Sequence, residues 1–490
     1  MLTPSSNAPR RNAPSRRAAA VVAGVSMSVL LAACGGGSTT PTAQQQGNKN
    51  SSSPAAKKSG ERVTINWFIG LGTGADQGQP AQQKKIVDAF NASQDEINLK
   101  MIVVNNKVAA TTLATQVSGG NAPDIVGPVG VKGAGQFEGQ WLDLEPLMKS
   151  QNFDTSIYDP EQVKAARDRK GVQTALPFGV YPSFLWYNKD LFDEAGLPYP
   201  PAKFGEKYED GREWNFDTMR DVAKKLTVDA NGNDATSAEF DPAKVEQWGY
   251  TPQFAETGPQ YTGAIFGPGS FVAKDGKTAQ VPEPYLASWK WHHDLIWKDY
   301  ASPNKKQLDS DTLNKGNGFA TGKIGMAITH SWYMCCAKTS DDKPQTFWDI
   351  AAIPSYKGKI TAKLHQDTFR ILKSTKHPEE SFKVLSHFLT DAAPELLKIY
   401  NAMPANQALQ DDYFASLDEV WTQQPNWQVA KDALNYPDIP NHESWTPNFN
   451  KVNDRLTTLG TKFTSDPNLD VEAEAKKFEA DLQKLYAAAK

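Results

Sequence analysis

Apolar and polar residues follow two different periods along the chain after about residue 62. Apolar runs rich in β-branched residues predict strands at 63–70 and 97–104. Apolar residues that recur every three or four positions predict helices at 82–92 and 111–117. Strands that alternate with helices in this way predict an α/β fold, with a largely parallel sheet and helices on both of its faces.

The same alternation continues toward the C-terminus. Segment 174–197 has the pattern of a strand, a bend, a second strand and a short helix. Segment 215–226 predicts a helix whose N-cap is Asn215 or Asp217. A buried strand is expected to end at Trp332.

The first 33 residues predict an export signal, because four arginines and no acidic residue precede an apolar run. This run ends in Leu31-Ala32-Ala33-Cys34-Gly35, which resembles a bacterial lipobox in which Cys34 receives a lipid. A plain signal peptide with an incidental cysteine is the alternative. The Arg16-Arg17 pair leaves both general secretion and twin-arginine export open.

Residues 34–61 contain no aromatic or large aliphatic residue, so they predict a flexible tether. A lipid, a tether and a folded body indicate an extracytoplasmic protein anchored to the cell membrane, on the cell surface or in the periplasm.

Length and charge narrow the possible functions. The chain has 490 residues, which is enough for two or more domains. Loss of the four signal arginines leaves 48 basic residues against 56 acidic residues, a net charge of −8. This charge argues against a nucleic acid as partner.

The cysteines give no cofactor or metal site. Besides Cys34, the chain has only Cys335 and Cys336, which are adjacent. Neighbouring Cα atoms lie about 3.8 Å apart, below the usual range for a disulfide. The two residues could be small buried hydrophobic side chains, a strained vicinal disulfide or an intermolecular link. His292 and His293 are expected on a solvated helix face and not at a metal.

Segment 70–75 matches the loose pattern G-x-G-x-x-[GA] of a dinucleotide-binding loop. The predicted helix starts only at 82, however, and no acidic residue follows the second strand for a ribose. We therefore expect no nucleotide cofactor. The loop is predicted to form one wall of a ligand cleft, with glycines that admit the ligand.

Four segments carry a family resemblance. The sequence LPFGVYPSFLWYNKDLFDEAGLPYPP at 176–201 resembles the signature of family 1 extracellular solute-binding proteins of ABC importers, the maltose-binding-protein class. GNAPDIV at 120–126, GQWLDLEPLM at 139–148 and FATGKIGMAITHSW at 319–332 are similar to other family segments and follow in the family's order. The resemblance spans about 62–490.

This resemblance implies a two-lobed periplasmic-binding-protein fold with discontinuous lobes, a hinge and an interlobe ligand cleft. Lobe I would be 62–181 plus 371–437, and lobe II would be 182–370 plus 438–490. The protein would capture a carbohydrate by hinge closure and deliver it to the permease of an ABC importer, with no enzymatic activity. We expect a monomer.

Two alternatives stay open. A binding protein for glycerol phosphate or another polyol ester would need Arg or Lys side chains that converge on phosphate, and the expected cleft segments contain few arginines. A secreted carbohydrate-active hydrolase would need a pair of carboxylates, whose spacing is spatial and not visible in the sequence.

Sugar binding needs flat aromatic faces and fixed polar groups for the hydroxyls. The resemblance places a stacking aromatic residue at Trp332 and a ligand contact at Tyr181. Asp367 could accept hydrogen bonds from sugar hydroxyls or cap a turn, and it follows His365-Gln366, where the family more often has two glycines. The predicted ligand-binding residues are Trp332, Tyr181, Trp445, Phe254, Gln253, Asp367, Thr73 and Gly72.

Overall fold

The computed structural model describes residues 62–489, except 169, 254–257, 340–342 and 439–445. The predictions for Cys34, Phe254 and Trp445 therefore lie outside the described residues, as do the predicted signal and tether. In the part that is described, no helix is long and apolar enough to cross a membrane.

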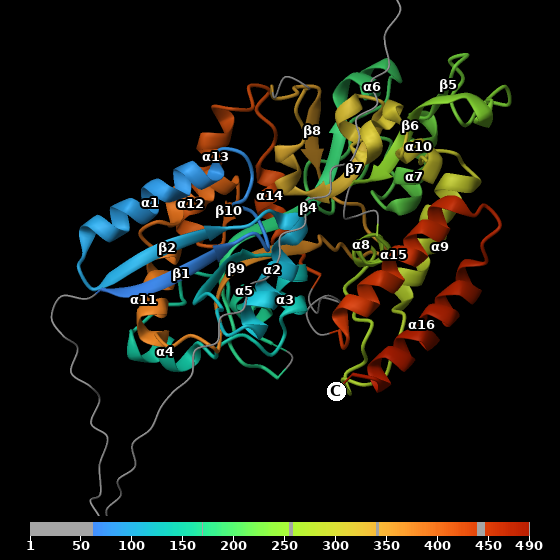
Figure 1. Cartoon of the computed structure of the whole chain (residues 1–490). Helices are drawn as coiled ribbons and strands as arrows, with labels where there is room; N and C mark the ends of the chain where they lie inside the picture. Colours follow the sequence, from blue (N-terminus) through green and yellow to red (C-terminus); the bar gives the residue numbers. More distant parts are fainter. Residues whose placement is uncertain (1–61, 169, 254–257, 340–342, 439–445, 490) are drawn as a thin grey trace, which may run out of the picture. The chain divides into compact units, whose positions relative to one another are not determined.

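The first strands and helices alternate as the sequence predicts (Figure 1). Strand β1 (Val63–Ile69) lies between β2 (Ile97–Val103) and β3 (Ile125–Val129) and is parallel to both. Helices α1 (Gln79–Ser93) and α2 (Asn106–Ser118) connect them. Helix α1 starts three residues before the prediction, because Pro80 fits a first helical turn.

Strand β4 (Leu176–Asn188) connects two halves of the sheet. The predicted bend inside this segment is wrong, because the strand is continuous over 13 residues. Up to Pro182 it pairs with β9 (Leu364–Ile371), and from Ser183 it pairs with β7 (Ile324–His330) and β8 (Trp348–Ala351). The chain therefore exchanges strand partners between Pro182 and Ser183.

The whole sheet has the order β2-β1-β3-β9-β4-β7-β6-β5, with β8 and β10 beside β4. The prediction of a largely parallel sheet is wrong, because β9 runs antiparallel to β3 and β4, and β4 runs antiparallel to β7, β8 and β10. Hydrophobic periodicity identifies a strand but does not reveal its direction. Strand β9 pairs with β3 and with the first part of β4, which belong to the first half of the sheet. The predicted lobe boundaries stay predictions.

The remaining elements complete both halves. The other strands are β5 (Val228–Asp229), β6 (Val245–Pro252) and β10 (Met403–Pro404). The other helices are α3 (Val131–Gln136), α4 (Glu145–Ser150), α5 (Pro160–Ala165), α6 (Lys189–Glu194), α7 (Phe216–Lys225), α8 (Pro259–Ala264), α9 (Glu283–Trp297), α10 (Lys305–Leu308), α11 (Pro378–Leu389), α12 (Ala393–Tyr400), α13 (Gln410–Asp418), α14 (Gln428–Ala433), α15 (Phe449–Ser465) and α16 (Val471–Ala487). The 3₁₀ helices are η1 (Pro242–Lys244), η3 (Asp311–Gly316), η4 (Phe319–Thr321), η5 (Ser331–Cys335) and η6 (Gln407–Leu409).

Helices cover both faces of the first half of the sheet. On one face, Trp67 packs against Phe388 of α11 with ring centroids 4.4 Å apart. On the other face, Phe68 lies in a separate apolar cluster with residues of α2, such as Leu113. These faces alternate along β1 because successive strand residues point to opposite sides.

Helices α9, α15 and α16 pack together in the second half (Figure 1). The buried residues of α16 recur every three or four positions, so this helix is amphipathic. The prediction that His292 and His293 lie on a solvated helix face is wrong, since the side chains of both residues are buried in α9. His293 Nε2 lies 2.9 Å from the carbonyl oxygen of Asp466, which follows α15.

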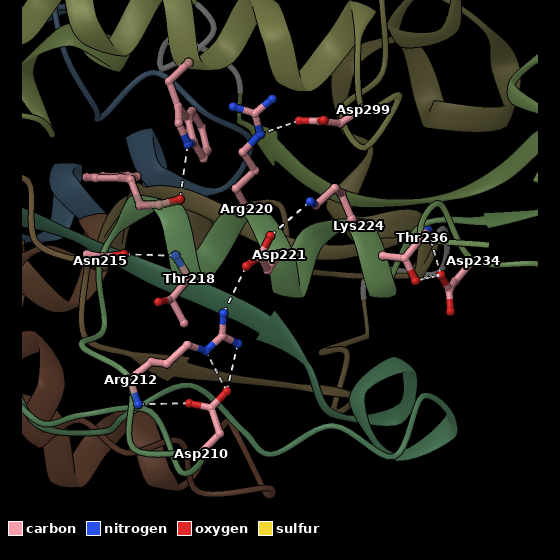
Figure 2. A network of polar contacts seen from close by, with 12 residues as sticks. Asp210, Arg212, Asn215, Thr218, Arg220, Asp221, Lys224, Asp234, Thr236 and Asp299 are labelled. Carbon is pink, nitrogen blue, oxygen red and sulfur yellow. Dashed lines mark hydrogen bonds and ion pairs between the residues drawn. The ribbon is translucent and has the colours of Figure 1, made fainter. Parts of the chain in front are cut away.

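A network of ion pairs surrounds α7 (Figure 2). Arg212 contacts Asp210 at 2.7 Å and Asp221 at 2.9 Å, and Arg220 contacts Asp299 at 2.5 Å. Helix α7 begins as predicted, with Asn215 as its N-cap. The side chains at Arg212 are about half exposed, so each of its pairs contributes at most about 1 kcal/mol.

A buried ion pair holds the segment just before β9. Lys363 Nζ lies 3.4 Å from Asp438 Oδ2, and each side chain is 1% exposed. Asp438 Oδ1 also accepts a hydrogen bond from the Leu364 amide at 2.8 Å. The Lys363 ammonium lies 4.9 Å from the ring centroid of Tyr261. This pair therefore joins the start of β9 to the chain at Asp438.

We expect Lys363→Met to lower the free energy of unfolding by about 3–5 kcal/mol, because it leaves the buried Asp438 carboxylate without its cation. The measurement is urea denaturation. Lys357→Met is the control, since Lys357 pairs with Glu283 at an exposed site and its loss should cost at most about 1 kcal/mol. Equal losses in the two variants would contradict the structural role of the buried pair.

Candidate ligand-binding site

The opening loop packs tightly on its neighbours. A Cβ atom at Gly72 would lie 2.6 Å from the carbonyl oxygen of Pro128, so only glycine fits there. The Gly72 carbonyl accepts a hydrogen bond from Asn106 Nδ2 at 2.9 Å. The glycine thus has a structural reason in the close approach of two backbones, and its role toward a ligand stays a prediction.

Three of the predicted residues meet at one carboxylate. Asp367 on β9 lies close enough to the Thr73 amide and the Tyr181 hydroxyl for both groups to lower the pKa of its carboxyl. Asp367 is 8% exposed, and Tyr181 is buried on β4. The Asp367 carboxylate also faces Gly130, where a Cβ atom would lie 3.3 Å from Oδ1. The fold therefore brings together residues from three distant segments of the chain.

The electrostatics of this cluster follow from its burial. Loss of water raises the pKa of Asp367 to about 6, although the hydrogen bonds from Thr73 and Tyr181 oppose the shift. Burial and the neighbouring Asp367 charge raise the pKa of Tyr181 well above its usual value. Tyr181 therefore stays a hydrogen-bond donor at neutral pH.

A row of stacked rings lies beside this cluster. Trp332 stacks on His330 with centroids 5.8 Å apart, and His330 stacks on His365 at 3.8 Å. Tyr261 of α8 meets His365 edge-on at 5.4 Å. His365 is the strand partner of Tyr181, so these four rings, which we call the aromatic row, adjoin the Asp367 cluster.

The sequence predicted a strand that ends at Trp332, and this prediction is wrong. Strand β7 ends at His330, and Trp332 lies in the 3₁₀ helix η5 that follows. Its side chain is half-buried and packs against two apolar clusters, one that includes Tyr181 and one that includes Tyr333. The early end of the strand turns Trp332 toward the aromatic row.

The cysteines follow Trp332 at the end of η5. Cys335 is exposed and Cys336 is half-buried, and both are free. Their sulfur atoms lie 2.6 Å apart. The interpretation as two small buried hydrophobic residues is therefore wrong, because Tyr333 and Met334 occupy the inward positions of η5 instead. The vicinal disulfide is also wrong, because neither sulfur is in a disulfide. The intermolecular link stays a prediction.

Gln253 lies at the end of β6 with a fully buried side chain. Its Nε2 donates to the Gly316 carbonyl at 2.6 Å, and its Oε1 accepts from the Phe319 amide at 3.3 Å. The amide thus bonds the backbone of the η3–η4 region. A ligand contact by Gln253 stays a prediction.

Sequence analysis missed the role of His330 and Tyr261 in the aromatic row. The available signal was His365, which stands where the resembled family more often has glycine. In the structure this ring lies between those of His330 and Tyr261, but no sequence pattern joins residues that are about 30–100 positions apart. In the described part of the chain, no group of three or more metal-ligating side chains is present.

The fold is a mixed α/β sheet whose two halves share strand β4. The chain belongs to the family of bacterial extracellular solute-binding proteins, whose family model matches residues 75–394. This result confirms the family resemblance. It also places the protein among those that act outside the cytoplasm.

Individual relatives are more distant. A protein of Brucella abortus (strain 2308), named only as a binding protein, is 25% identical over 342 residues, which cover 68% of this chain and 75% of the relative. The ABC substrate-binding protein Lmo0181 of Listeria monocytogenes, solved in complex with cycloalternan, has a TM-score of 0.64 and 19% identity over 86% of this chain and 99% of that chain. The sugar-binding protein MalE of Xanthomonas citri has a TM-score of 0.65 and 14% identity over 87% of this chain and 98% of that chain. These likenesses confirm the predicted fold class.

The raised pKa of Asp367 predicts a pH effect on stability. The folded protein binds the Asp367 proton more tightly than the unfolded chain does. The contribution of Asp367 to the free energy of unfolding is therefore greatest below the unfolded pKa of 3.8, and it falls as pH rises through about 6. Asp367→Asn removes this penalty. The stability of the variant relative to wild type should therefore rise by about 2.4 kcal/mol between pH 4 and pH 7.

Urea denaturation at pH 4, 5, 6 and 7 measures this difference. Asp88→Asn is the control, because Asp88 lies on an exposed face of α1 in an ion pair with Lys84. A constant difference between Asp367→Asn and wild type across this range would show that the carboxyl is not strained by burial.

Proposed function

We propose that the protein is a non-catalytic binding protein that captures a carbohydrate by hinge closure and delivers it to the permease of an ABC importer. The observation that carries this proposal is the cluster of Thr73, Tyr181 and Asp367 beside the aromatic row. Polar groups fixed next to flat rings are what a sugar requires, since it presents hydroxyls at its edge and C–H groups on its faces.

The polar half of the site retains hydrogen-bonding capacity. A carboxylate has about four acceptor positions, and the neighbouring Thr73 amide and Tyr181 hydroxyl can occupy at most two of those of Asp367. The remaining positions can accept hydrogen bonds from sugar hydroxyls. Because Thr73 and Tyr181 hold the carboxylate in one orientation, little conformational entropy is lost when a ligand binds.

The aromatic half contributes a stacking surface. Trp332 is the end member of the aromatic row and is only half-buried, so part of its ring stays accessible. The relatives from L. monocytogenes and X. citri are named for cycloalternan and for sugar, respectively, which supports a carbohydrate as the ligand class.

The proposal includes the lipid attachment to the cell membrane that the sequence predicts, on the cell surface or in the periplasm. A lipid on Cys34 would hold the tether 34–61 at the membrane, and the folded body would act there as a monomer. Two lobes, at 62–181 plus 371–437 and at 182–370 plus 438–490, would close on the ligand. The change of strand partners after Pro182 supports a hinge near the first of these boundaries.

Thermal unfolding against a ligand panel tests the proposal. The protein from Ser59 to Lys490, which forms one compact unit, is mixed with mono- and oligosaccharides and with glycerol phosphates. A ligand at 100 times its dissociation constant stabilises by about 2.7 kcal/mol, so we expect a Tm shift of about 2 °C with a selective sugar.

Recovery of the sugar after incubation separates binding from hydrolysis. Intact sugar is the expected result, and cleaved sugar would identify a hydrolase. A shift with glycerol phosphates and none with sugars would replace the carbohydrate by a polyol ester.

We expect Trp332→Ala to weaken sugar binding roughly ten- to a hundredfold, because it removes a stacking face. Trp332→Phe keeps a flat ring, so its affinity for the sugar should fall less than that of Trp332→Ala. Isothermal titration well below the unfolding temperature separates affinity from stability. Tyr199→Ala is the control, since Tyr199 is an exposed aromatic residue elsewhere on the protein. Unchanged affinity in Trp332→Ala would exclude Trp332 from the site.

A further inference from the structure

A second polar site lies on the opposite face of β9 from Asp367. The side chains of Leu364, Gln366, Thr368 and Arg370 line a cavity of about 80 Å³, whereas Asp367 lies on the other side of the strand. Val129, on one side of Gly130, also lines the cavity, and Gly130 itself faces the Asp367 carboxylate. The cavity is therefore adjacent to the candidate site but separate from the Asp367 cluster.

Arg370 is the unusual group in this cavity. It is 8% exposed, and its Nε and Nη1 atoms donate to the hydroxyls of Thr368 and Thr174, each at 3.0 Å. The guanidinium carbon lies 5.4 Å from the ring centroid of Trp141. Among the described residues, the other three N–H groups of Arg370 have no hydrogen-bond partner, and no carboxylate lies within 4 Å.

The other charged residues of the cavity wall do not neutralise Arg370. Arg167 is paired with Glu145 at 2.9 Å. Asp168 is half-buried, and its Oδ1 accepts from the amides of Lys170 and Val172. Glu138 is exposed at the rim. Arg370 is thus a buried cation whose direct partners are neutral hydroxyls and a ring.

A buried charge without a counter-charge is costly, so such a group persists where it has a use. Burial lowers the pKa of Arg370 to about 9, and the charge of Asp168 opposes this shift. The guanidinium therefore stays positive at neutral pH. Its planar fork suits the two oxygens of a carboxylate or of a phosphate ester, and the threonine hydroxyls fix its orientation.

We propose that Arg370, with Thr174, Thr368 and Trp141, forms a subsite for the oxyanion group of an acidic carbohydrate. This inference rests on the proposed carbohydrate function and makes it specific, because the ligand would carry a carboxylate or a phosphate ester. The acidic group of the ligand would occupy the cavity at Arg370, on the face of β9 opposite to Asp367.

Matched ligands test this proposal on the full chain. Isothermal titration compares glucose with glucuronate, galactose with galacturonate, and each neutral sugar with its 1-phosphate, together with short oligomers. Wild type should bind an acidic member roughly ten- to a hundredfold more tightly than its neutral partner. The uronate and phosphate arms show which oxyanion the cavity prefers.

Variants assign the preference to Arg370. Arg370→Met should abolish the preference and leave the affinity for the neutral sugar within about twofold, and Arg370→Lys should retain a small part of it because lysine lacks the planar fork. Arg220→Gln is the control, since Arg220 is a partly buried arginine paired with Asp299 away from the cavity (Figure 2). It should keep the full preference.

The outcomes separate this inference from the proposed function. Neutral sugars that bind as tightly as their acidic partners in wild type would overturn the subsite and leave the carbohydrate function standing. Binding of glycerol phosphate without any carbohydrate would overturn both. If Arg370→Met does not fold, the wild-type preference and its loss in Arg370→Lys decide the question. A preference that Arg370→Met and Arg370→Lys retain would also overturn the assignment.

Discussion

The antiparallel pairing of β4 with β9 is the constraint on which the rest of the structure depends. These two strands carry the chain between the two halves of the sheet, and β4 changes its partners after Pro182. Backbone hydrogen bonds along a buried strand leave no freedom to slip, because a shift by one residue would move every side chain to the other face. The register of this pair therefore fixes the distance between Tyr181 and His365 and the position of Asp367.

The same register distributes charge to two sides of β9. Asp367 points toward Thr73 and Tyr181, whereas Arg370 points toward Thr174 and Trp141. Lys363, just before the strand, differs from both because Asp438 neutralises it directly. A balanced pair of this kind serves the fold. Asp367 and Arg370, which contact neutral groups instead, retain the capacity to bind polar or charged groups of a ligand.

The sequence predicted the local elements well, because they depend on local patterns. The alternation at β1, α1 and β2 and the cap at Asn215 are visible in neighbouring residues. The direction of β9 and the continuity of β4 were not predicted, since both depend on partners far away in the chain. The burial of His292 and His293 was missed for the same reason, because α15 and its C-terminal turn lie more than 150 residues later.

For the site, the family resemblance supplied Tyr181 and Trp332, and the fold explained why they lie near each other. It could not supply Arg370, whose importance follows from burial without a counter-charge. This property belongs to the assembled cavity and to no motif.

The two unbalanced groups also give a physical reason for closure on a ligand. In the absence of a ligand, Asp367 and Arg370 each keep a desolvation cost that their neutral partners only partly offset. Hydroxyls at Asp367 and an acidic group at Arg370 would each lower the desolvation cost on their own face of β9. A ligand that made these contacts better in a closed arrangement than in an open one would shift a hinge equilibrium toward closure. Under the proposed function, the position of Asp367 and Arg370 three residues apart on one strand would link recognition to closure through the strand that also joins the two halves of the sheet.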